Sequence, residues 1–196
     1  MNERLNKTSI CSIVFLDIVE YSQMPGNDQI EIKDRFNALI SAALQNVPKS
    51  DSIILDTGDG AAISLLGAPE EAIFVSLTIR EGILKDNEAH DIPLLVRIGI
   101  NLGPVRVVKD INDRPNIIGD GINVAQRVMS FAEPNQILVS RSYYEIVSRL
   151  STELGGMFSY SGVKADKHVR EHEVYAVVKG GGKQFTPPRP KVKNML

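Results

Sequence analysis

The sequence predicts an α+β or mixed α/β domain, because short apolar strand segments alternate with stretches whose apolar residues recur at helical spacing. A nearly continuous apolar run at 9–17, rich in β-branched residues, predicts a strand buried on both faces. Two further strand segments, 52–55 and 61–66, flank an Asp-Gly turn and predict a β-hairpin. Together these patterns indicate a layered domain of strands and helices.

The first two helices flank this hairpin in the sequence. Apolar residues at helical spacing predict a helix over 27–47, with Asn27 or Asp28 as its cap and Pro48 after its end. A Pro-Glu-Glu sequence at 69–71 predicts the start of a second helix, because proline and acidic residues favour a first helical turn.

The second half of the chain continues the alternation of strands and helices. Residues 94–102 predict a strand, and Gly103 with Pro104 predicts a turn into another strand at 105–108. The later elements are expected to be a helix, a strand, a short helix and two closing strands, at 120–131, 137–140, 143–150, around Phe158 and at 174–178.

Composition and charge exclude several classes of protein. Of the 196 residues, 43% are hydrophobic and 23% are charged, which is typical of a globular domain with a sizeable core. The formal net charge of −2 provides no basic field for nucleic acid, and no apolar stretch approaches membrane-spanning length. We therefore expect neither nucleic acid nor a membrane as partner. The single cysteine, Cys11, cannot form an internal disulfide, which favours a cytoplasmic setting.

The composition changes after Val178. Residues 1–178 are therefore expected to form the domain, and 179–196, rich in glycine, proline and basic residues, are expected to form a flexible tail. A docking role for the proline-rich segment 187–190 is the alternative interpretation.

Two aspartates are the first candidates for chemistry. Asp17 ends the apolar run, and Asp59 lies at the tip of the predicted hairpin. If the hairpin pairs beside the first strand, both carboxylates meet at one edge of the sheet, where they suit hard divalent cations that also bind phosphates. Taken singly, Asp17 is as well explained as a cap and Asp59 as a turn residue. The glycine and small residues around each allow phosphate to approach the backbone, which favours the metal interpretation.

A second cluster lies on the helix predicted at 120–131. Asn123 and Arg127 are four residues apart, so they share a helix face. An amide beside a guanidinium can orient a ribose and neutralise charge on a phosphoryl group, although the spacing equally fits a solvated surface. His168 and His172 have ligand-like spacing too, but their region is predicted as strand and loop, so we expect them to be polar surface residues.

Three segments, in this order, resemble the catalytic domain of the class III nucleotidyl cyclases, the adenylate and guanylate cyclases, and the resemblance covers roughly 9–178. Residues 15–22 are similar to the first metal motif of that family, 57–60 to the second, and 123–127 to its Asn-x-Ala-x-Arg helix. The resemblance implies a ferredoxin-like fold, with a central, mainly antiparallel sheet flanked by helices. It also implies a head-to-tail homodimer, in which one subunit supplies the aspartates and the other the Asn/Arg helix.

The resemblance further implies an activity and its cofactors. In that family two Mg²⁺ or Mn²⁺ ions assist attack of the ribose 3′-hydroxyl on the α-phosphate of a nucleoside triphosphate, which releases pyrophosphate and a 3′,5′-cyclic nucleotide. Carried over to this chain, Asp17, Asp59 and the Ile18 carbonyl ligate the metals. Asn123 then positions the ribose, and Arg127 stabilises charge at the α-phosphate.

The triphosphate is expected, by the same resemblance, to bind the loop after the first strand and one lysine. The lysine comes from the C-terminal strands, where Lys167 is the candidate and Lys164 the alternative. The loop is expected to supply four backbone amides and one hydroxyl, from Ile18, Val19, Glu20, Tyr21 and Ser22.

Base selection is where the sequence departs from the family. Adenylate cyclases place lysine at the position of Leu55 and often Asp or Thr at that of Asn116, and guanylate cyclases use Glu and a small polar residue. Leu55 cannot hydrogen-bond a purine edge, whereas Asn116 can read many bases. One interpretation is a purine cyclase of relaxed specificity. We favour the other, a pyrimidine cyclase acting on UTP or CTP, similar to the stand-alone bacterial cyclases of the Pycsar anti-phage systems, which are also compact domains with altered base-selecting residues.

Two other interpretations compete with an active cyclase. A non-catalytic cyclase-homology domain would bind nucleotide or regulate a partner, but such domains usually lose a metal aspartate or the catalytic arginine, and this chain has both. A palm-type domain, such as a diguanylate cyclase or a polymerase palm, is disfavoured by the missing Gly-Gly-Asp/Glu-Glu-Phe signature and by the chain's charge.

Overall fold

The computed structural model describes residues 5–178, so the tail predicted at 179–196 lies outside the described residues. The described residues form an eight-stranded sheet in the order β2-β3-β1-β4-β6-β8-β7, with β5 paired to β4 off this path. The named strands pair antiparallel except for the parallel pair β4–β6, which confirms the predicted α+β fold with a mainly antiparallel sheet. The strands are β1 (Thr8–Ile18), β2 (Ser52–Asp56), β3 (Gly60–Leu65), β4 (Val96–Lys109), β5 (Pro115–Ile118), β6 (Ile137–Ser140), β7 (Phe158–Ala165) and β8 (Glu171–Val177).

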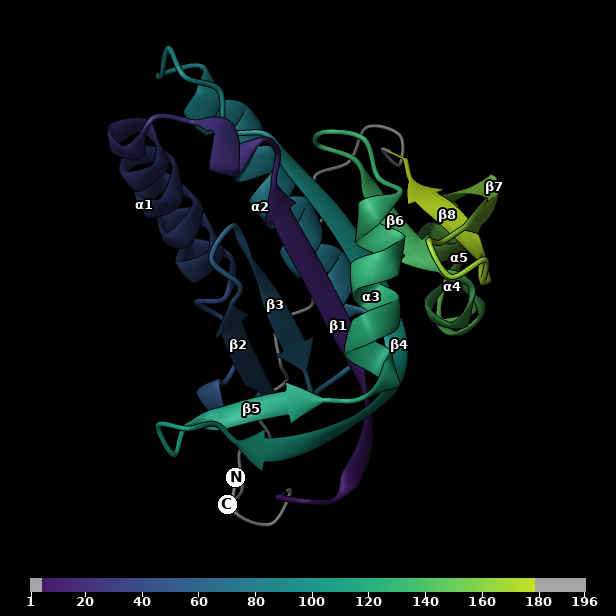
Figure 1. Ribbon diagram of the computed structural model, residues 1–196. Helices are drawn as coiled ribbons and strands as arrows, with labels where there is room; N and C mark the ends of the chain where they lie inside the picture. The colour runs from purple at the N-terminus through teal and green to yellow at the C-terminus, as the bar shows by residue number, and fades with distance from the viewer. Residues whose placement is uncertain (1–4, 179–196) are drawn as a thin grey trace, which may run out of the picture.

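Helices cover both faces of this sheet, with α1 and α2 on one face and α3 across the other (Figure 1). No helix within residues 5–178 is both long and apolar enough to cross a membrane. The helices are α1 (Gly26–Ala43), α2 (Glu71–Asn87), α3 (Asp120–Ser130), α4 (Arg141–Val147) and α5 (Thr152–Gly155).

The central strand β1 is buried between the two helical layers, as its apolar run predicts. Successive side chains of a strand point to opposite faces. Leu16 and Ile18 pack into the core under α1 and α2, whereas Ile13 and Phe15 pack with residues of α3. Asp17 follows the alternation of Ile13 and Phe15, so its carboxylate lies on the α3 face of the sheet.

Strand β4 is continuous, so the prediction of a turn at Gly103 and Pro104 is wrong. Antiparallel pairing with β1 runs through both residues, with Pro104 opposite Ile10. On its other side, β4 pairs with β6 before this stretch and with β5 after it. The stretch around Pro104 is therefore a local sheet edge, where proline is tolerated.

The start of α1 differs from its prediction as well. The helix begins at Gly26, directly after Pro25, so neither Asn27 nor Asp28 is its cap. Pro25 has φ −57° and ψ 151°, an extended conformation that the proline ring stabilises and that leads the chain into the helix.

The helix predicted at 143–150 is α4, which begins two residues earlier and ends at Val147, and a further short helix, α5, follows it without having been predicted. Each begins with a serine cap: the Ser140 hydroxyl accepts the Tyr143 N–H at 3.3 Å, and the Ser151 hydroxyl accepts the Leu154 N–H at 3.2 Å. Serine three residues before an amide donor is a usual start signal for a helix, and it marks both boundaries in the sequence.

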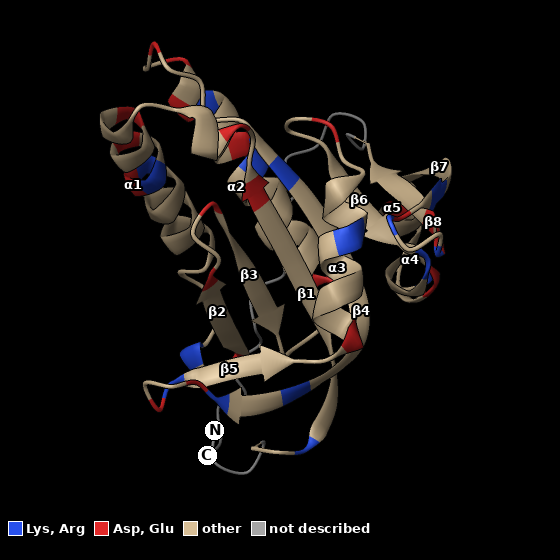
Figure 2. Cartoon of the chain, viewed as in Figure 1, with Lys and Arg blue, Asp and Glu red and all other residues tan. Residues whose placement is uncertain are grey.

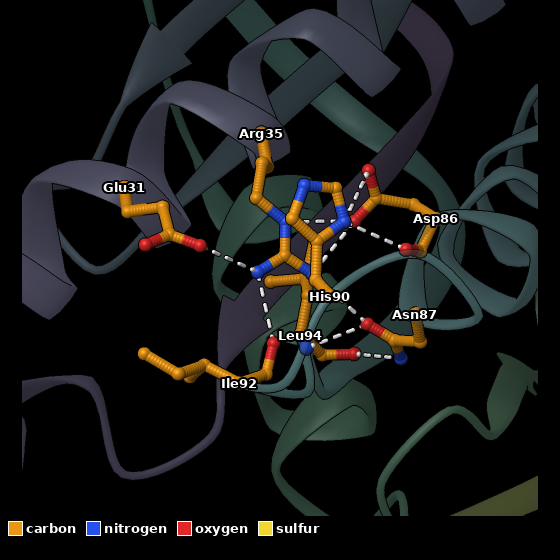
Figure 3. Close-up of polar contacts among 7 residues, drawn as sticks. All are labelled: Glu31, Arg35, Asp86, Asn87, His90, Ile92 and Leu94. Carbon is orange, nitrogen blue, oxygen red and sulfur yellow. Dashed lines mark hydrogen bonds and ion pairs between the residues drawn. The ribbon is translucent and has the colours of Figure 1, made fainter.

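Arg35 ties α1 and α2 to the chain that enters β4 (Figure 3). Its side chain is 9% exposed, and its guanidinium donates to Asp86 Oδ2 and to the Ile92 carbonyl, both at 2.8 Å. Asn87 extends the network by accepting the Leu94 N–H at 2.8 Å and donating to the Leu94 carbonyl at 2.9 Å. Because β4 begins two residues after Leu94, this network fixes where β4 enters the sheet.

Candidate active site

The register of two strand pairs brings the aspartates together. Asp17 lies opposite Gly60 in the β1–β3 pair and opposite Arg97 in the β1–β4 pair. Asp59 directly precedes Gly60, and its carbonyl accepts the Ile18 N–H at 2.8 Å. The two aspartates are therefore neighbours across the β1–β3 pair, at the end of β1.

Two glycines shape the hairpin that carries Asp59. An added Cβ at Gly60 would lie 2.0 Å from the Leu16 carbonyl oxygen, so only glycine allows β3 to approach β1 this closely. Gly58 has φ 87°, and its N–H donates to Asp56 Oδ1 at 2.7 Å. The glycines on both sides of Asp59 are thus required by the backbone that positions it.

Asp17 has a charged neighbour that the sequence interpretation missed. Arg97 donates to Asp17 Oδ2 through Nε at 3.1 Å and also through Nη2. Figure 2 shows the acidic end of β1 beside a basic segment of β4. The Asp17 side chain is only 15% exposed, whereas Asp59 is exposed in the hairpin turn. The sequence signal that could have predicted this ion pair is the lone arginine in the otherwise apolar segment 94–100.

The donor set around the aspartates fits a hard divalent cation. Within residues 5–178 there is no group of three or more His, Cys, Asp or Glu side chains that could hold a metal. Asp17, Asp59 and a backbone carbonyl are oxygen donors, which suit Mg²⁺ or Mn²⁺ when substrate phosphates complete the coordination.

The loop after β1 corrects part of the phosphate prediction. The Ile18 and Val19 amides donate to the carbonyls of Asp59 and Leu95 at 2.8 and 2.9 Å, so they hold neighbouring segments together and are not available for phosphate. The chain then turns through a short 3-10 segment, whose first N–H groups have no partner within the turn. Of the groups predicted to bind phosphate, the backbone amides of Glu20 and Tyr21 and the hydroxyl of Ser22 remain.

The second cluster is held on α3. Asn123 is exposed, and the Arg127 side chain is 28% exposed. The opposite side of the helix packs on the sheet through Ala125 and Met129. At Gly99 of β4 the two backbones nearly touch, because an added Cβ would lie 2.2 Å from the Met129 nitrogen.

Within one chain Arg127 is directed to the far end of the sheet. Its Nε lies 3.7 Å from Oδ2 of Asp166, in the loop between β7 and β8. Those two strands end the sheet on the side away from β3, with β6 between them and β4. Lys167 is exposed next to Asp166, and Lys164 is exposed on β7. The aspartate pair and the Arg127–Lys167 region therefore lie on different elements of the chain.

The loop also corrects the prediction for His172. Its side chain is 8% exposed, so it is not a surface residue, and its Nε2 lies 3.2 Å from Asp166 Oδ2. His168 is exposed, as expected.

The two positions expected to select the base lie on contacting strands, β2 and β5. Leu55 packs against the apolar cluster that contains Ile117. Asn116 is half-buried, and its Oδ1 accepts the N–H of Ile117 at 2.7 Å. Within residues 5–178, the Nδ2 group of Asn116 forms no hydrogen bond.

Comparison with known proteins supports the fold and gives the family. The model of the family described as "Adenylate and Guanylate cyclase catalytic domain" matches residues 4–177. The crystal structure of the adenylyl cyclase CyaB from P. aeruginosa superimposes with a TM-score of 0.72 at 22% identity, over 88% of this chain and 95% of that one. The guanylate cyclase domain of RhGC from Catenaria anguillulae, in complex with GTP, gives 0.71 at 22% identity, over 88% and 98%.

A curated relative agrees with this assignment. Retinal guanylyl cyclase 2 of Rattus norvegicus is 28% identical over 92% of this chain. The chain spans only 14 to 23% of the length of the curated relatives it matches. Because the family model covers nearly every residue that the structure describes, this chain belongs to the adenylate and guanylate cyclase catalytic domains, a family of lyases that generally use divalent metal ions.

Proposed function

We propose that this chain is a nucleotidyl cyclase, which converts a nucleoside triphosphate into a 3′,5′-cyclic nucleotide and pyrophosphate. The observation that carries the proposal is the pairing of Asp17 with Asp59 across β1 and β3, together with Asn123 and Arg127 on one helix. Membership of the cyclase family supports the same reaction class.

The aspartate half-site binds metal and phosphate in this proposal. Asp17, Asp59 and the Ile18 carbonyl hold two divalent cations, Mg²⁺ or Mn²⁺. When bound, the cations supply the charge that lowers the pKa of the 3′-hydroxyl and stabilises the pyrophosphate. The turn from Glu20 to Ser22 receives the terminal phosphates, and Arg97 adds positive charge beside Asp17.

The other half-site orients the sugar and neutralises charge. Asn123 positions the ribose, Arg127 stabilises the charge that develops at the α-phosphate, and Lys167, or alternatively Lys164, binds the triphosphate. Since Arg127 contacts the β7–β8 loop, at the end of the sheet away from β3, we propose that two copies join head to tail. Such a homodimer has two equivalent sites, each completed by both subunits.

For the base we propose a pyrimidine, with a purine cyclase of relaxed specificity as the alternative. Leu55 offers only methyl groups, so the purine reader of the family is absent. Asn116 offers the N–H donors of its Nδ2 group, because its Oδ1 is bonded to the backbone. Donors pair with a carbonyl edge, which uracil has and cytosine lacks at the equivalent position. We therefore place UTP before CTP, and GTP before ATP if the pocket admits purines.

The test is incubation of the purified protein with Mn²⁺ and each of the four nucleoside triphosphates, followed by mass spectrometry of the products. The proposal expects a cyclic nucleotide with UTP as the substrate of highest kcat/KM. A clear preference for ATP or GTP would overturn the pyrimidine assignment alone. Absence of cyclic product with all four would overturn the cyclase and favour a domain that only binds nucleotide.

We also propose that the product is a signal in defence against phage, by analogy with the Pycsar cyclases. Efficiency of plating measures this, in cells carrying the gene in its native neighbourhood. We expect fewer plaques with the wild-type gene than with Asp59→Ala. Equal plaque numbers for the two would reject the defensive role and leave the enzymatic proposal intact.

A further inference from the structure

The loop between β7 and β8 is built around the carboxylate of Asp166. Its Oδ1 accepts the N–H groups of His168 at 2.8 Å and Arg170 at 3.1 Å. Its backbone also closes the loop, because the Asp166 N–H donates to the Arg170 carbonyl at 3.0 Å and its carbonyl accepts from Val169 at 2.9 Å. Val169 has φ 62°. One carboxylate oxygen thus serves a local turn.

The loop between β4 and β5 repeats this turn around Asp110. Its Oδ1 accepts the N–H groups of Asn112 at 2.8 Å and Arg114 at 2.9 Å, and Asp113 has φ 62°. The Asp110 N–H donates to the Arg114 carbonyl at 2.8 Å, as in the other loop. Within residues 5–178, Oδ2 of Asp110 forms no hydrogen bond or ion pair, and only Oδ1 is bonded. The turn itself therefore needs only one carboxylate oxygen.

The second oxygen of Asp166 reaches beyond its own loop. Oδ2 lies 3.2 Å from His172 Nε2 and 3.7 Å from Arg127 Nε. The Asp166 side chain is 6% exposed. The His172 ring also lies against the ring of Phe131, just after the last turn of α3, with 5.9 Å between the ring centres. Asp166 and His172 thus link the loop to both Arg127 and the end of its helix.

The ionisation of Asp166 agrees with this geometry. Burial alone would raise the pKa of the carboxyl group. The hydrogen bonds from His172 and from the amides of His168 and Arg170 outweigh burial, and they lower the pKa to about 2. The group is therefore a carboxylate at neutral pH and can pair with a guanidinium.

We propose that Asp166 is a positioning residue for Arg127, holding the guanidinium by its Nε side so that the Nη groups are presented to the α-phosphate of the substrate bound by the partner subunit. The inference rests on the proposed function, because it assigns a task to Arg127. A free arginine side chain occupies many rotamers, and a fixed carboxylate reduces them before the reaction. The same loop carries Lys167, so Asp166 sets the relative position of two phosphate-binding side chains.

Asp166→Asn separates the two tasks of the carboxylate. Asparagine retains an Oδ1 for the turn but replaces Oδ2 with a neutral NH₂ group, which can neither accept the hydrogen bond from His172 nor form an ion pair with Arg127. Asp110→Asn makes the same change in the matching turn and serves as control. For Asp166→Asn we expect kcat to fall about tenfold to a hundredfold, with KM for the triphosphate changed less, since misplacement of a reacting group costs rate. For Asp110→Asn we expect kcat and KM to stay at wild-type values.

A double-mutant cycle with Arg127→Ala tests whether the effect passes through Arg127. If Asp166 acts by positioning, Asp166→Asn lowers kcat in the wild-type background and has no further effect in Arg127→Ala. An equal loss in both backgrounds, or wild-type kcat for Asp166→Asn, would overturn the positioning role while the cyclase remains. If the wild-type protein makes no cyclic nucleotide, the proposed function fails, and this inference fails with it.

Discussion

At the scale of single residues, the two aspartates of the candidate site have unlike surroundings. Asp17 is largely buried and pairs with Arg97, so its removal leaves an arginine without its counter-ion. The Asp59 side chain is exposed, and only its backbone carbonyl bonds to Ile18. Asp59 is therefore the better position for separating catalysis from folding.

We expect Asp59→Ala to lower cyclic nucleotide formation at least a hundredfold, because one of two carboxylate ligands for the cations is lost. The free energy of unfolding should change by no more than about 0.5 kcal/mol, since an exposed side chain is removed. Product assays and urea unfolding measure the two effects, and Thr57→Ala in the same turn is the control. Retained activity, or loss of the folded state, would contradict the assignment.

Asn116 provides a test of base reading. Asn116→Asp is nearly isosteric and replaces the Nδ2 donors with an acceptor, which suits the amino group of cytosine better than the carbonyl of uracil. We expect the ratio of kcat/KM for CTP to that for UTP to rise about tenfold, the size of effect expected from the net contribution of one hydrogen bond. Asn112→Asp, in the exposed loop beside it, should leave the ratio unchanged. An unchanged ratio in Asn116→Asp would show that this residue does not contact the base.

At the scale of elements, α3 is held close to the sheet by Gly99. A Cβ added at Gly99 would lie only 2.2 Å from the backbone nitrogen of Met129 in α3. The helix that carries Asn123 and Arg127 can therefore lie this close to β4 only because residue 99 is glycine.

We expect Gly99→Ala to push α3 away from β4 and to destabilise the fold by about 1–3 kcal/mol, the usual cost of overpacking. Activity should fall by more than the unfolded fraction explains, because Arg127 moves with the helix. Urea unfolding and kcat, both measured where the variant remains folded, separate these effects. Gly26→Ala is the control, since a Cβ there meets nothing within 4 Å. Wild-type stability in Gly99→Ala would rule out this packing.

Local sequence signals predicted most elements but not the contacts between distant residues. The alternation in β1 and the glycines beside Asp59 are local signals, so the strand, the hairpin and the proximity of the two aspartates were predictable. Gly103 with Pro104 predicts a turn from local sequence alone, because whether a strand tolerates this proline depends on which strands flank β4. Arg97 and Asp17 are 80 residues apart and meet through the register of β1 and β4. Asp166 is nearly 40 residues from Arg127, and the two meet where α3 lies beside the β7–β8 loop, so neither pair follows from a short motif.

At the scale of the whole molecule, the strand order separates the two half-sites. The aspartate pair lies at β1 and β3, whereas Arg127 contacts the loop of β7 and β8 at the other end of the sheet. In the proposed homodimer, each complete site is built from two copies of the chain. Two variants of very low activity, each damaged in a different half-site, should then complement each other.

We expect a mixture of Asp59→Ala and Arg127→Ala, each with only a small residual activity alone, to recover about a quarter of the wild-type activity. Random pairing of equal amounts makes about half of the dimers mixed, and each mixed dimer has one site with both half-sites intact and one with neither. The measurement is the product formed after the two proteins are mixed and allowed to exchange subunits, with a mass-tagged chain to show that mixed dimers form. Mixed dimers without activity would mean that each site is built from one chain, which would overturn the shared-site arrangement.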